Sequence, residues 1–246
     1  MTVRRITAFI RRKVKEANAR GVVVGMSGGV DSSLVALLCA RALGPKRVLG
    51  IHMPDKFTDP SDSEDVKVLS RKLKIRLEVV DLEPIVRAFR VLPRLGESKI
   101  ALGNLKARIR MAILYYYANL LGYLVVGTSN RSELRAGYFT KYGDGASDLL
   151  PLGSLYKTQV RELARELGLP ERIIQKVPSA GFWPGQTDEG ELGISYEKLD
   201  GIYMRLDEGK SPQQIARELG VSIRTVRDII QRERQTEHKR VPPPTP

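Results

Sequence analysis

A cluster of small and acidic residues near the start of the chain has the composition of a phosphate-binding turn. Three valines at 22–24 suit a buried strand, and an apolar block at 34–40 suits a buried helix. Between them lies SGGVDSS, residues 27–33. A turn of this kind directs backbone N–H groups and the positive end of a helix dipole toward a bound anion. We therefore predict a phosphate site here, with an ordinary βα turn as the alternative.

Two common phosphate-binding motifs do not match this turn. The P-loop requires Lys after its last glycine, where this chain has Val30 and Asp31. The dinucleotide-binding motif requires a spacing that Gly25, Gly28 and Gly29 do not have. The string SGGVDSS instead resembles the pyrophosphate loop of the ATP pyrophosphatases, which include NAD, GMP and asparagine synthetases and several tRNA-modifying enzymes. The resemblance implies that ATP is cleaved between its α- and β-phosphates and that a carboxyl or carbonyl oxygen is activated as an adenylate.

A second polar cluster follows a predicted strand at 123–127. In a parallel sheet, the end of this strand would lie at the same edge as the phosphate loop, which brings Glu133 near Asp31. Two carboxylates suit one Mg²⁺ ion that bridges phosphate oxygens. A solvated position in the first turn of a helix is the alternative for Glu133. Lys157 lies in the first turn of a later predicted helix, where a cation favours a nearby anion.

Length, composition and charge favour an α/β domain that acts on anionic ligands. The 246 residues are 42% hydrophobic and 28% charged, with a net charge of +13. This net charge has three possible explanations: a general surface charge as in heat-adapted proteins, a nucleotide substrate, or a nucleic-acid partner. The sparse aromatic residues (6%) weaken RNA binding by stacking. One Cys and two His nearly exclude a structural zinc site.

The beginning of the chain and its single cysteine indicate the compartment. No apolar stretch approaches the length of a membrane span, and the first residues are typical of an amphipathic helix rather than a signal peptide. We therefore expect a cytoplasmic protein. Cys39 lies in the predicted buried helix, has no partner for an internal disulfide, and is expected to be a core residue.

The predicted elements alternate between strands and helices, which favours a parallel, doubly wound sheet. Further strands are expected at 47–53 and 75–80, and a long helix is expected after a cap at Asn104. The polar loop 54–62 follows a strand end and is a candidate for contacts to a nucleotide base. His52 has no carboxylate placed for acid–base chemistry, so we expect it to be structural.

We expect one domain over 1–246, with a helical C-terminal segment at 195–240 and a proline-rich tail at 241–246. Residues 211–230 are typical of a helix-turn-helix, with Gly220 at the turn. This pattern supports a nucleic-acid-binding protein, and a helical hairpin with basic polar faces is the other interpretation. The glycine-rich, acidic residues 181–193 predict either a mobile lid or a plain surface loop.

Over residues 4–244 the chain resembles the ammonia-dependent NAD synthetases. The resemblance rests on SGGVDSS, on GTSNRSELRAGYFTKYGDGASDLLPLGSLYKTQV at 127–160, and on TEHKRVPPP at 236–244. The segment GYFTKYGDG and the terminal HKRVPPP are not shared with GMP synthetases or tRNA thiolases. The resemblance implies a homodimer with an α/β fold: a doubly wound, Rossmann-like (adenine nucleotide alpha hydrolase-like) parallel sheet of five strands, with helices on both faces and a helical C-terminal segment.

The reaction implied by this resemblance is an amide-forming ligation. ATP adenylates the nicotinate carboxylate of deamido-NAD⁺ with release of pyrophosphate, and ammonia then displaces AMP to give NAD⁺, the last step of NAD biosynthesis. Ammonia is expected to be free or delivered by a separate protein, because there is no room for a glutaminase domain. The alternatives are another ATP pyrophosphatase such as a tRNA-modifying enzyme, whose usual cysteines and RNA-binding domain are missing, and the helix-turn-helix protein. Small molecules are the expected partners, with no nucleic acid and no membrane.

The resemblance also implies which residues bind each substrate. Asp31 and Lys157 are the expected catalytic residues, and Asp31 and Glu133 are expected to bind Mg²⁺. The expected ATP contacts are Gly25, Met26, Ser27, Gly28, Gly29, Val30, Asp31, Ser32, Thr128, Lys157 and Ser179. The expected deamido-NAD⁺ contacts are Arg108, Lys141, Asp148, His238 and Lys239. Ser179 stands where many relatives have Thr, and the hydroxyl is kept. The loop 54–62 lacks the Arg and Gln of bacterial relatives, which leaves the adenine contacts around Met53 open.

Overall fold

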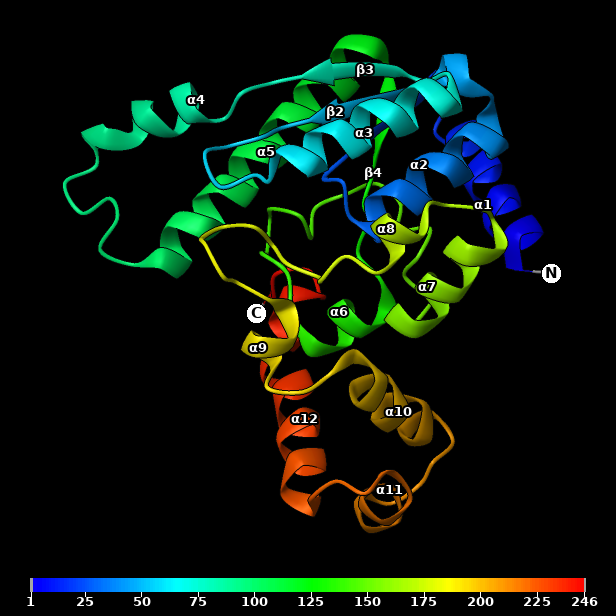
Figure 1. Ribbon diagram of the computed structural model, residues 1–246, viewed down its shortest axis with the longest axis vertical. Coiled ribbons are helices and arrows are strands. Elements are labelled where there is room, and N and C mark those ends of the chain that lie inside the picture. Colours follow the sequence, from blue (N-terminus) through cyan, green and yellow to red (C-terminus); the bar gives the residue numbers. More distant parts are fainter. Residues whose placement is uncertain (1, 246) are drawn as a thin grey trace.

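A parallel sheet of four strands in the order β3-β2-β1-β4 forms the centre of the protein (Figure 1). The structure is a computed structural model and describes residues 2–245, so Met1 and Pro246 lie outside the described residues. The strands are Gly21–Gly25 (β1), Val48–His52 (β2), Arg76–Val79 (β3) and Tyr123–Val126 (β4). In the register of the sheet, Val22 of β1 lies between Val48 of β2 and Leu124 of β4. The strand that carries the predicted phosphate loop is therefore central.

The predicted number of five strands is wrong for the described residues. Beyond the edge of β4, a single parallel bridge joins Val126 to Leu149 and no further ladder forms there in residues 2–245. The segment before Leu149 is rich in Gly and Asp, which are depleted in strands. The α/β class and the parallel sheet are confirmed.

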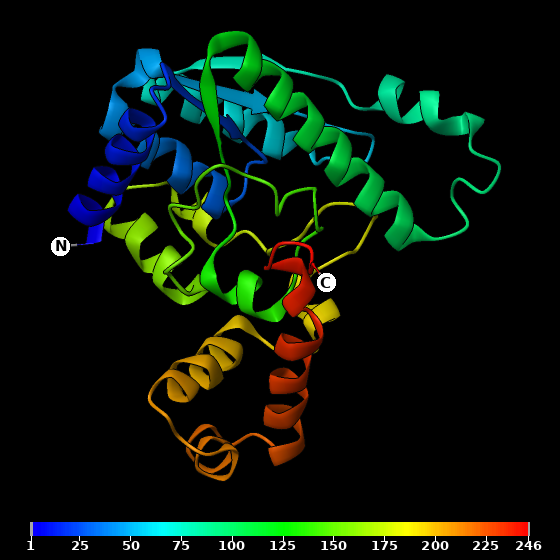
Figure 2. The same cartoon turned by 180° about the vertical axis from the view of Figure 1, so that it is seen from behind.

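Helices cover both faces of the sheet because successive strand side chains point to opposite sides. Val22 and Val24 pack on one face, and Val23 packs on the other. The first face is covered by Thr2–Glu16 (α1), Val30–Leu43 (α2), Pro60–Leu73 (α3), Lys157–Glu166 (α7) and Glu171–Ile174 (α8), and the second by Lys99–Leu121 (α5). Figures 1 and 2 show these helices from the two sides. The continuous valine run of β1 is thus buried on both faces.

The long helix α5 begins before the predicted cap. Its N-cap is Ser98, whose hydroxyl accepts a hydrogen bond from the N–H of Ala101 at 3.2 Å, so the prediction of Asn104 as the cap is wrong. Gly103 suggests a helix break in the sequence but lies inside the helix. A Cβ atom at this position would overlap the ring of Phe182, so Gly103 gives that ring space against the helix backbone.

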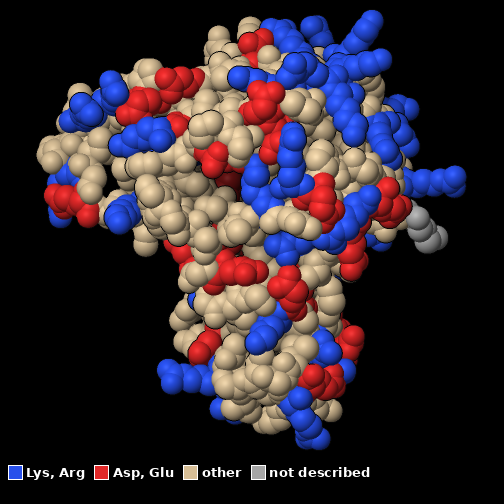
Figure 3. Space-filling model, in the orientation of Figure 1, with Lys and Arg blue, Asp and Glu red and all other residues tan. Residues whose placement is uncertain are grey.

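Residues 81–98 project from the body of the protein as an arm (Figures 1 and 2). The arm contains Glu83–Ala88 (α4) and a 3₁₀ turn at Phe89–Val91 (η2), and another 3₁₀ turn, Pro45–Arg47 (η1), precedes β2. Lys and Arg side chains gather at the upper right of Figure 3, over α1, α2 and α3. On this face, the positive charge is therefore concentrated at one end.

The C-terminal helices form a lobe with a core of its own. The lobe contains Tyr196–Asp207 (α10), Pro212–Leu219 (α11) and Ile223–Gln235 (α12), with Asp188–Leu192 (α9) before it. Buried Ile202, Ile215 and Val226 join the three helices in a second apolar cluster. After α12 the chain returns to the main body through a 3₁₀ turn, Glu237–Lys239 (η3), beside Arg131–Ala136 (α6) (Figure 2).

Two single-residue predictions are confirmed in the core. Cys39 is fully buried in α2, and burial raises the pKa of its thiol to about 12. His52 is buried at the end of β2, where its Nδ1 donates to the carbonyl of Met26 and its Nε2 accepts from the hydroxyl of Ser63, each at 2.8 Å. Burial lowers the pKa of His52, which favours the neutral ring that this bonding pattern uses. Within residues 2–245, we find no helix long and apolar enough to cross a membrane.

Candidate active site

The glycine-rich turn forms a loop between β1 and α2, as the sequence predicts. The N–H of Ser27 donates to the hydroxyl of Ser32 at 3.2 Å, and the N–H of Gly29 donates to the hydroxyl of Ser27 at 3.3 Å. Gly29 is the N-cap of α2 and has no side chain to offer, so the first N–H groups of α2 are left for an anion. Gly28 has φ +90°, and a Cβ there would lie 2.9 Å from the carbonyl oxygen of Asp62. Only glycine fits this close approach of α3.

A lysine and two carboxylates converge beside this loop. The Nζ of Lys157 lies 2.5 Å from Oδ2 of Asp31 and 3.5 Å from Oε1 of Glu133. The Lys157 side chain is only 3% exposed. The expected proximity of Asp31 and Glu133 is therefore present, and both carboxylates contact the same ammonium group. Lys157, the first residue of α7, brings its charge to the end of the sheet from more than a hundred residues away.

Asn130 fixes the position of both carboxylates, a role that the sequence does not reveal. Its side-chain NH₂ donates to Oδ1 of Asp31 at 2.9 Å. Its side-chain oxygen accepts from the N–H of Glu133 at 3.1 Å, and Oε2 of Glu133 accepts from the N–H of Asn130 at 3.2 Å. This reciprocal capping box begins α6. The S/T/D/N-x-x-E spacing of such a box is visible in the sequence, but the bond to Asp31 depends on the fold.

Burial and charge shift the pKa values of this cluster. Burial, reinforced by the nearby Asp31 carboxylate, raises the pKa of Glu133 to about 8. Burial alone would lower the pKa of Lys157, but the Asp31 and Glu133 carboxylates outweigh it and raise that pKa. Lys157 is therefore a permanent cation, and it faces a site where negative charge is otherwise concentrated.

Two further buried groups join this cluster: Asp188, from the candidate lid segment 181–193, and Tyr196, the first residue of α10. The hydroxyl of Tyr196 donates to Oδ2 of Asp188 at 3.1 Å, and Nζ of Lys157 lies 5.2 Å from the centre of the Tyr196 ring. Oδ1 of Asp188 is buried and has no hydrogen-bond partner among residues 2–245. Nothing in the local sequence distinguishes Asp188 from the acidic residues beside it, and its burial follows from the packing of α9 against α10.

Four of the five expected deamido-NAD⁺ contacts lie together around residues 137–141. The guanidinium of Arg108 donates to the carbonyl of Lys141 at 3.2 Å, and Nζ of Lys141 donates to the carbonyl of His238 at 2.6 Å. Nζ of Lys239 donates to the carbonyls of Gly137 and Phe139 at 2.8 and 3.0 Å. Residues from three distant parts of the chain thus converge on one basic cluster.

Asp148, the fifth expected contact, bonds to the edge of the sheet. Its Oδ2 accepts from the N–H of Val125 in β4 at 2.7 Å, and its Oδ1 accepts from the hydroxyl of Tyr115 at 3.3 Å. The carboxylate therefore satisfies a backbone donor that a fifth strand would otherwise occupy. Its partner Tyr115 lies on α5, the helix that also carries Arg108.

Two expected ATP contacts are not joined to the lysine cluster. Thr128 follows β4 and is half-buried, and Ser179 is exposed in the segment after α8, where its hydroxyl accepts from the N–H of Gly181 at 3.0 Å. In the described part of the chain, no hydrogen bond links either residue to Lys157 or to residues 25–32.

A buried ion pair joins α5 to the loop after β2. Nζ of Lys106 donates to Oδ2 of Asp55 at 2.7 Å, and both side chains are at most 2% exposed. Arg110 approaches the same oxygen at 3.8 Å. The charge of Lys106 is thus neutralised by Asp55 in the loop after β2, and it does not need an anion from outside the protein.

The carboxylates at the loop fit a magnesium ion. Asp31 and Glu133 already share one cation, the Lys157 ammonium, and their oxygens are the donor type that Mg²⁺ prefers. Among residues 2–245 there is no group of three or more His, Cys, Asp or Glu side chains placed to hold a metal. Mg²⁺ commonly takes one or two protein carboxylates and completes its coordination with water and phosphate oxygens, so two are sufficient.

The sheet and its loop are typical of a class of α/β proteins that bind the phosphates of a nucleotide at the carboxyl end of a central strand. Comparisons with known proteins identify the family. The sequence profile of NAD synthase matches residues 2–243, and the chain therefore belongs to the NAD synthase family.

Individual relatives agree with this assignment over nearly their whole length. The chain is 51% identical to an NH3-dependent NAD(+) synthetase from Methanocaldococcus jannaschii, over 99% of this chain and 95% of the relative. Among solved structures, an NMN synthetase from Francisella tularensis has a TM-score of 0.88 and 34% identity, covering 100% of this chain and 97% of that one. An NH3-dependent NAD synthetase from Campylobacter jejuni has a TM-score of 0.84 and 34% identity, covering 99% and 96%.

Proposed function

We infer that the protein catalyses the ATP-dependent amidation of deamido-NAD⁺ to NAD⁺ with ammonia, the last step of NAD biosynthesis. The observation that carries this inference is the buried Lys157, held between Asp31 and Glu133 beside a phosphate loop in a member of the NAD synthase family. The family assignment favours this ligase over the two alternatives, another ATP pyrophosphatase and a helix-turn-helix protein.

The site supplies what the first half of this reaction needs. A nicotinate carboxylate oxygen forms a bond to the α-phosphorus of ATP, and the bond to the β-phosphate oxygen breaks, so that pyrophosphate leaves with the electron pair. Negative charge moves among the phosphate oxygens during this step. Fixed donors stabilise such charge without reorganising, and here they are the first N–H groups of α2 and the ammonium of Lys157.

The second half of the reaction needs no protein nucleophile. Ammonia forms a bond to the carboxyl carbon, the bond to the AMP oxygen breaks, AMP leaves with that electron pair, and one proton is released. The absence of a Ser–His or Cys–His pair from the cluster around Lys157 agrees with this route. Cys39, fully buried in α2, is not available for glutaminase chemistry, so the nitrogen donor is ammonia itself.

We include Mg²⁺ in the proposal, held by Asp31 and Glu133. The ion would neutralise charge on phosphate oxygens of ATP and orient them. Loss of a proton from Glu133 would accompany its binding, since the carboxyl must be ionised to act as a ligand.

The proposed deamido-NAD⁺ site is the basic cluster of Arg108, Lys141, His238 and Lys239, with Asp148 near its edge. Arg108 is exposed and Lys141 is half-buried, and both carry charge that suits the diphosphate of a dinucleotide. The chain from Glu133 to residues 137–141 is continuous through the short helix α6, which connects the proposed metal ligand to this cluster. One α/β domain over residues 1–246 would thus hold both substrates, in the cytoplasm, where ATP is supplied.

We also propose that the protein is a homodimer. Exposed apolar side chains support this: Tyr116 and Leu120 are each 64% exposed on one face of α5, and Ile100 near its start is 66% exposed. Side chains of this size on one helix face are typical of a surface that a partner covers. A second copy of the chain is the partner that the family resemblance implies.

The decisive assay combines ATP, Mg²⁺, deamido-NAD⁺ and ammonium and measures NAD⁺, AMP and ADP. We expect equal amounts of NAD⁺ and AMP, and none of the amide when glutamine replaces ammonium. Because one similar structure is that of an NMN synthetase, nicotinate mononucleotide is tested in parallel, and we expect its kcat/KM to be at least about tenfold lower because the adenylate half contributes binding. Formation of ADP, or no NAD⁺, would contradict the proposal.

Asn130 offers a test of how the carboxylates are oriented. Asn130→Ala removes both the helix cap and the bond to Asp31, so we expect a loss of about 1 kcal/mol in the free energy of unfolding and a lower kcat. Asn130→Ser keeps a capping hydroxyl but does not reach Asp31, so stability should be largely kept while kcat still falls. Thermal unfolding and NAD⁺ formation measure the two effects. Equal kcat for Asn130→Ser and the wild type would show that the bond to Asp31 does not matter for turnover.

A further inference from the structure

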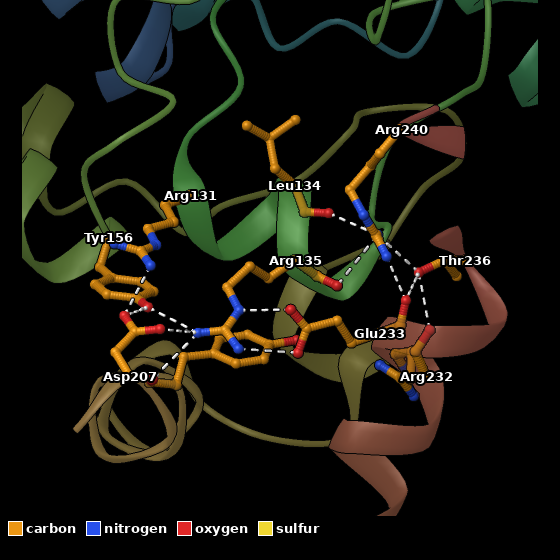
Figure 4. Close-up of polar contacts among 10 residues, drawn as sticks. Arg131, Leu134, Arg135, Tyr156, Asp207, Arg232, Glu233, Thr236 and Arg240 are labelled. Carbon is orange, nitrogen blue, oxygen red and sulfur yellow. Dashed lines mark hydrogen bonds and ion pairs between the residues drawn. The ribbon is translucent and has the colours of Figure 1, made fainter. Parts of the chain in front are cut away.

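Arg135, in the C-terminal half of α6, bonds to the C-terminal lobe (Figure 4). The guanidinium of Arg135 donates to both carboxylate oxygens of Glu233 on α12, at 2.7 and 3.0 Å. It also donates to Oδ1 of Asp207 at 2.9 Å and to the carbonyl of Tyr203 at 3.1 Å. The guanidinium carbon Cζ of Arg135 lies 4.2 Å from the centre of the Tyr203 ring. One side chain of α6 thus joins α10 and α12.

Arg135 makes these contacts in a partly dry environment. Its side chain is 18% exposed and that of Glu233 is 27% exposed. A bidentate Arg–carboxylate pair fixes the relative direction of the two groups as well as their distance. Tyr156 adds a further bond, since its hydroxyl accepts from Arg135 at 3.0 Å and donates to Asp207 at 2.7 Å. The direction of α12 relative to α6 is therefore set by a network rather than by one contact.

A second arginine continues this connection at the far end of α12. The guanidinium of Arg240 donates to the carbonyl of Leu134 at 2.9 Å, to the hydroxyl of Thr236 at 3.0 Å and to the carbonyl of Glu233. The carbonyl of Leu134 is in the last turn of α6, where a cation complements the helix dipole. Gly137 follows α6 directly, and a Cβ there would overlap the Thr236 side chain. At the ends of the two helices, the backbone of Gly137 after α6 therefore packs against the side chain of Thr236 after α12.

Two of the residues that we propose for deamido-NAD⁺, His238 and Lys239, directly precede Arg240 in the chain. His238 and Lys239 form the turn η3 that follows α12, and they contact residues 137–141, which follow α6. The contacts within the basic cluster are mostly side chain to backbone, so the cluster takes whatever position the ends of α6 and α12 give it. Arg135 and Glu233 add a bidentate contact between the two helices themselves.

We propose that Arg135 is a positioning residue for the deamido-NAD⁺ site, acting through Glu233 to fix where α12 delivers His238 and Lys239. This inference rests on the proposed function. On the ATP side, Asp31 and Glu133 are held by Asn130, and Lys157 bonds directly to Asp31, so in the described part of the chain Arg135 reaches this side only through the hydroxyl at the end of the Tyr156 side chain. The two substrates should consequently respond differently when Arg135 is replaced.

The test compares Arg135→Met with Arg205→Met. Arg205 is a matched control, because it pairs with Glu218 inside the C-terminal lobe at 2.7 Å and is 27% exposed, but it contacts neither α6 nor η3. For Arg135→Met we expect the Kd for deamido-NAD⁺, measured by calorimetry without ATP, to rise about tenfold or more, since small displacements of binding groups are costly. The KM for ATP should change less than about twofold. Arg205→Met should leave both values as in the wild type.

A purely structural role for Arg135 predicts a different pattern. Partial unfolding lowers the concentration of active enzyme and hence the apparent kcat, but it leaves Kd and KM unchanged. Glu233→Gln, which keeps the shape of the partner and removes its charge, is the second variant, and it should weaken deamido-NAD⁺ binding in the same direction by a smaller factor. An unchanged Kd in both variants, or an equal rise in Arg205→Met, would overturn the inference. If the wild type forms no NAD⁺, the proposed function itself fails. That result is distinct from the two outcomes that would overturn the role of Arg135.

Discussion

Lys157→Met should reduce the kcat for NAD⁺ formation by about 10³-fold, the scale seen when a preorganised donor to developing charge is removed. Lys157 is the cation beside the phosphate loop, 2.5 Å from Asp31, and Met keeps the length of the side chain without its charge. The change also leaves two carboxylates without their shared counter-ion. Breaking such a buried pair costs about 3 kcal/mol or more, although protonation of Glu133 will relieve part of the loss.

Single-turnover formation of AMP from ATP and deamido-NAD⁺ measures this effect on the adenylation step directly. Lys198→Met is the control, because Lys198 also lies in the first turn of a helix but is exposed on α10. We expect the control to behave as the wild type. A kcat for Lys157→Met within tenfold of the wild type would mean that the ammonium group does not stabilise the transferred phosphate.

Asp31→Asn should strongly reduce turnover at physiological Mg²⁺ concentrations. The amide keeps the shape of the side chain, but it loses the charge that pairs with Lys157 and that we propose for Mg²⁺. We expect kcat to fall by about 10³-fold, with the remaining activity requiring a higher Mg²⁺ concentration for half-saturation. Titration of NAD⁺ formation against Mg²⁺ checks both. Asp228→Asn, an exposed position on α12, should change neither. Full activity of Asp31→Asn would remove Asp31 from the metal site.

The parallel topology explains why part of the site can be predicted from the sequence. Asp31 follows β1 and Glu133 follows β4, and adjacent parallel strands bring their carboxyl ends to one edge. Two residues 102 positions apart (133 − 31) could therefore be placed together from strand patterns alone. The expected role of Lys157 in ATP binding came from the family resemblance, and its contact with both carboxylates is a finding of the structure.

The features that escaped prediction depend on tertiary contacts. Asn130 carries a local capping pattern, but its second bond, to Asp31, exists only once β1 and β4 are paired. Asp188 and Tyr196 become part of the site because α9 packs against α10. The start of α5 differs from the prediction because Ser98 and Asn104 are both good caps, and in the structure Ser98 caps the helix while Gly103 packs against Phe182 inside it. The bond of Asp148 likewise depends on the fold, because its carboxylate accepts from the N–H of Val125 at the edge of β4.

The order of the strands also determines the sequence of events when the chain folds. β1, which carries the phosphate loop, lies between β2 and β4, so it stays half-paired until Tyr123–Val126 has been synthesised. Lys157 emerges later still, 126 residues after its partner Asp31. Contacts between such distant segments form slowly because the intervening chain must first be closed into a loop. A nascent chain on the ribosome therefore contains its phosphate loop well before it contains Lys157, the cation that faces the loop. Until α7 docks, the carboxylate of Asp31 lacks this counter-ion and is hydrated by water.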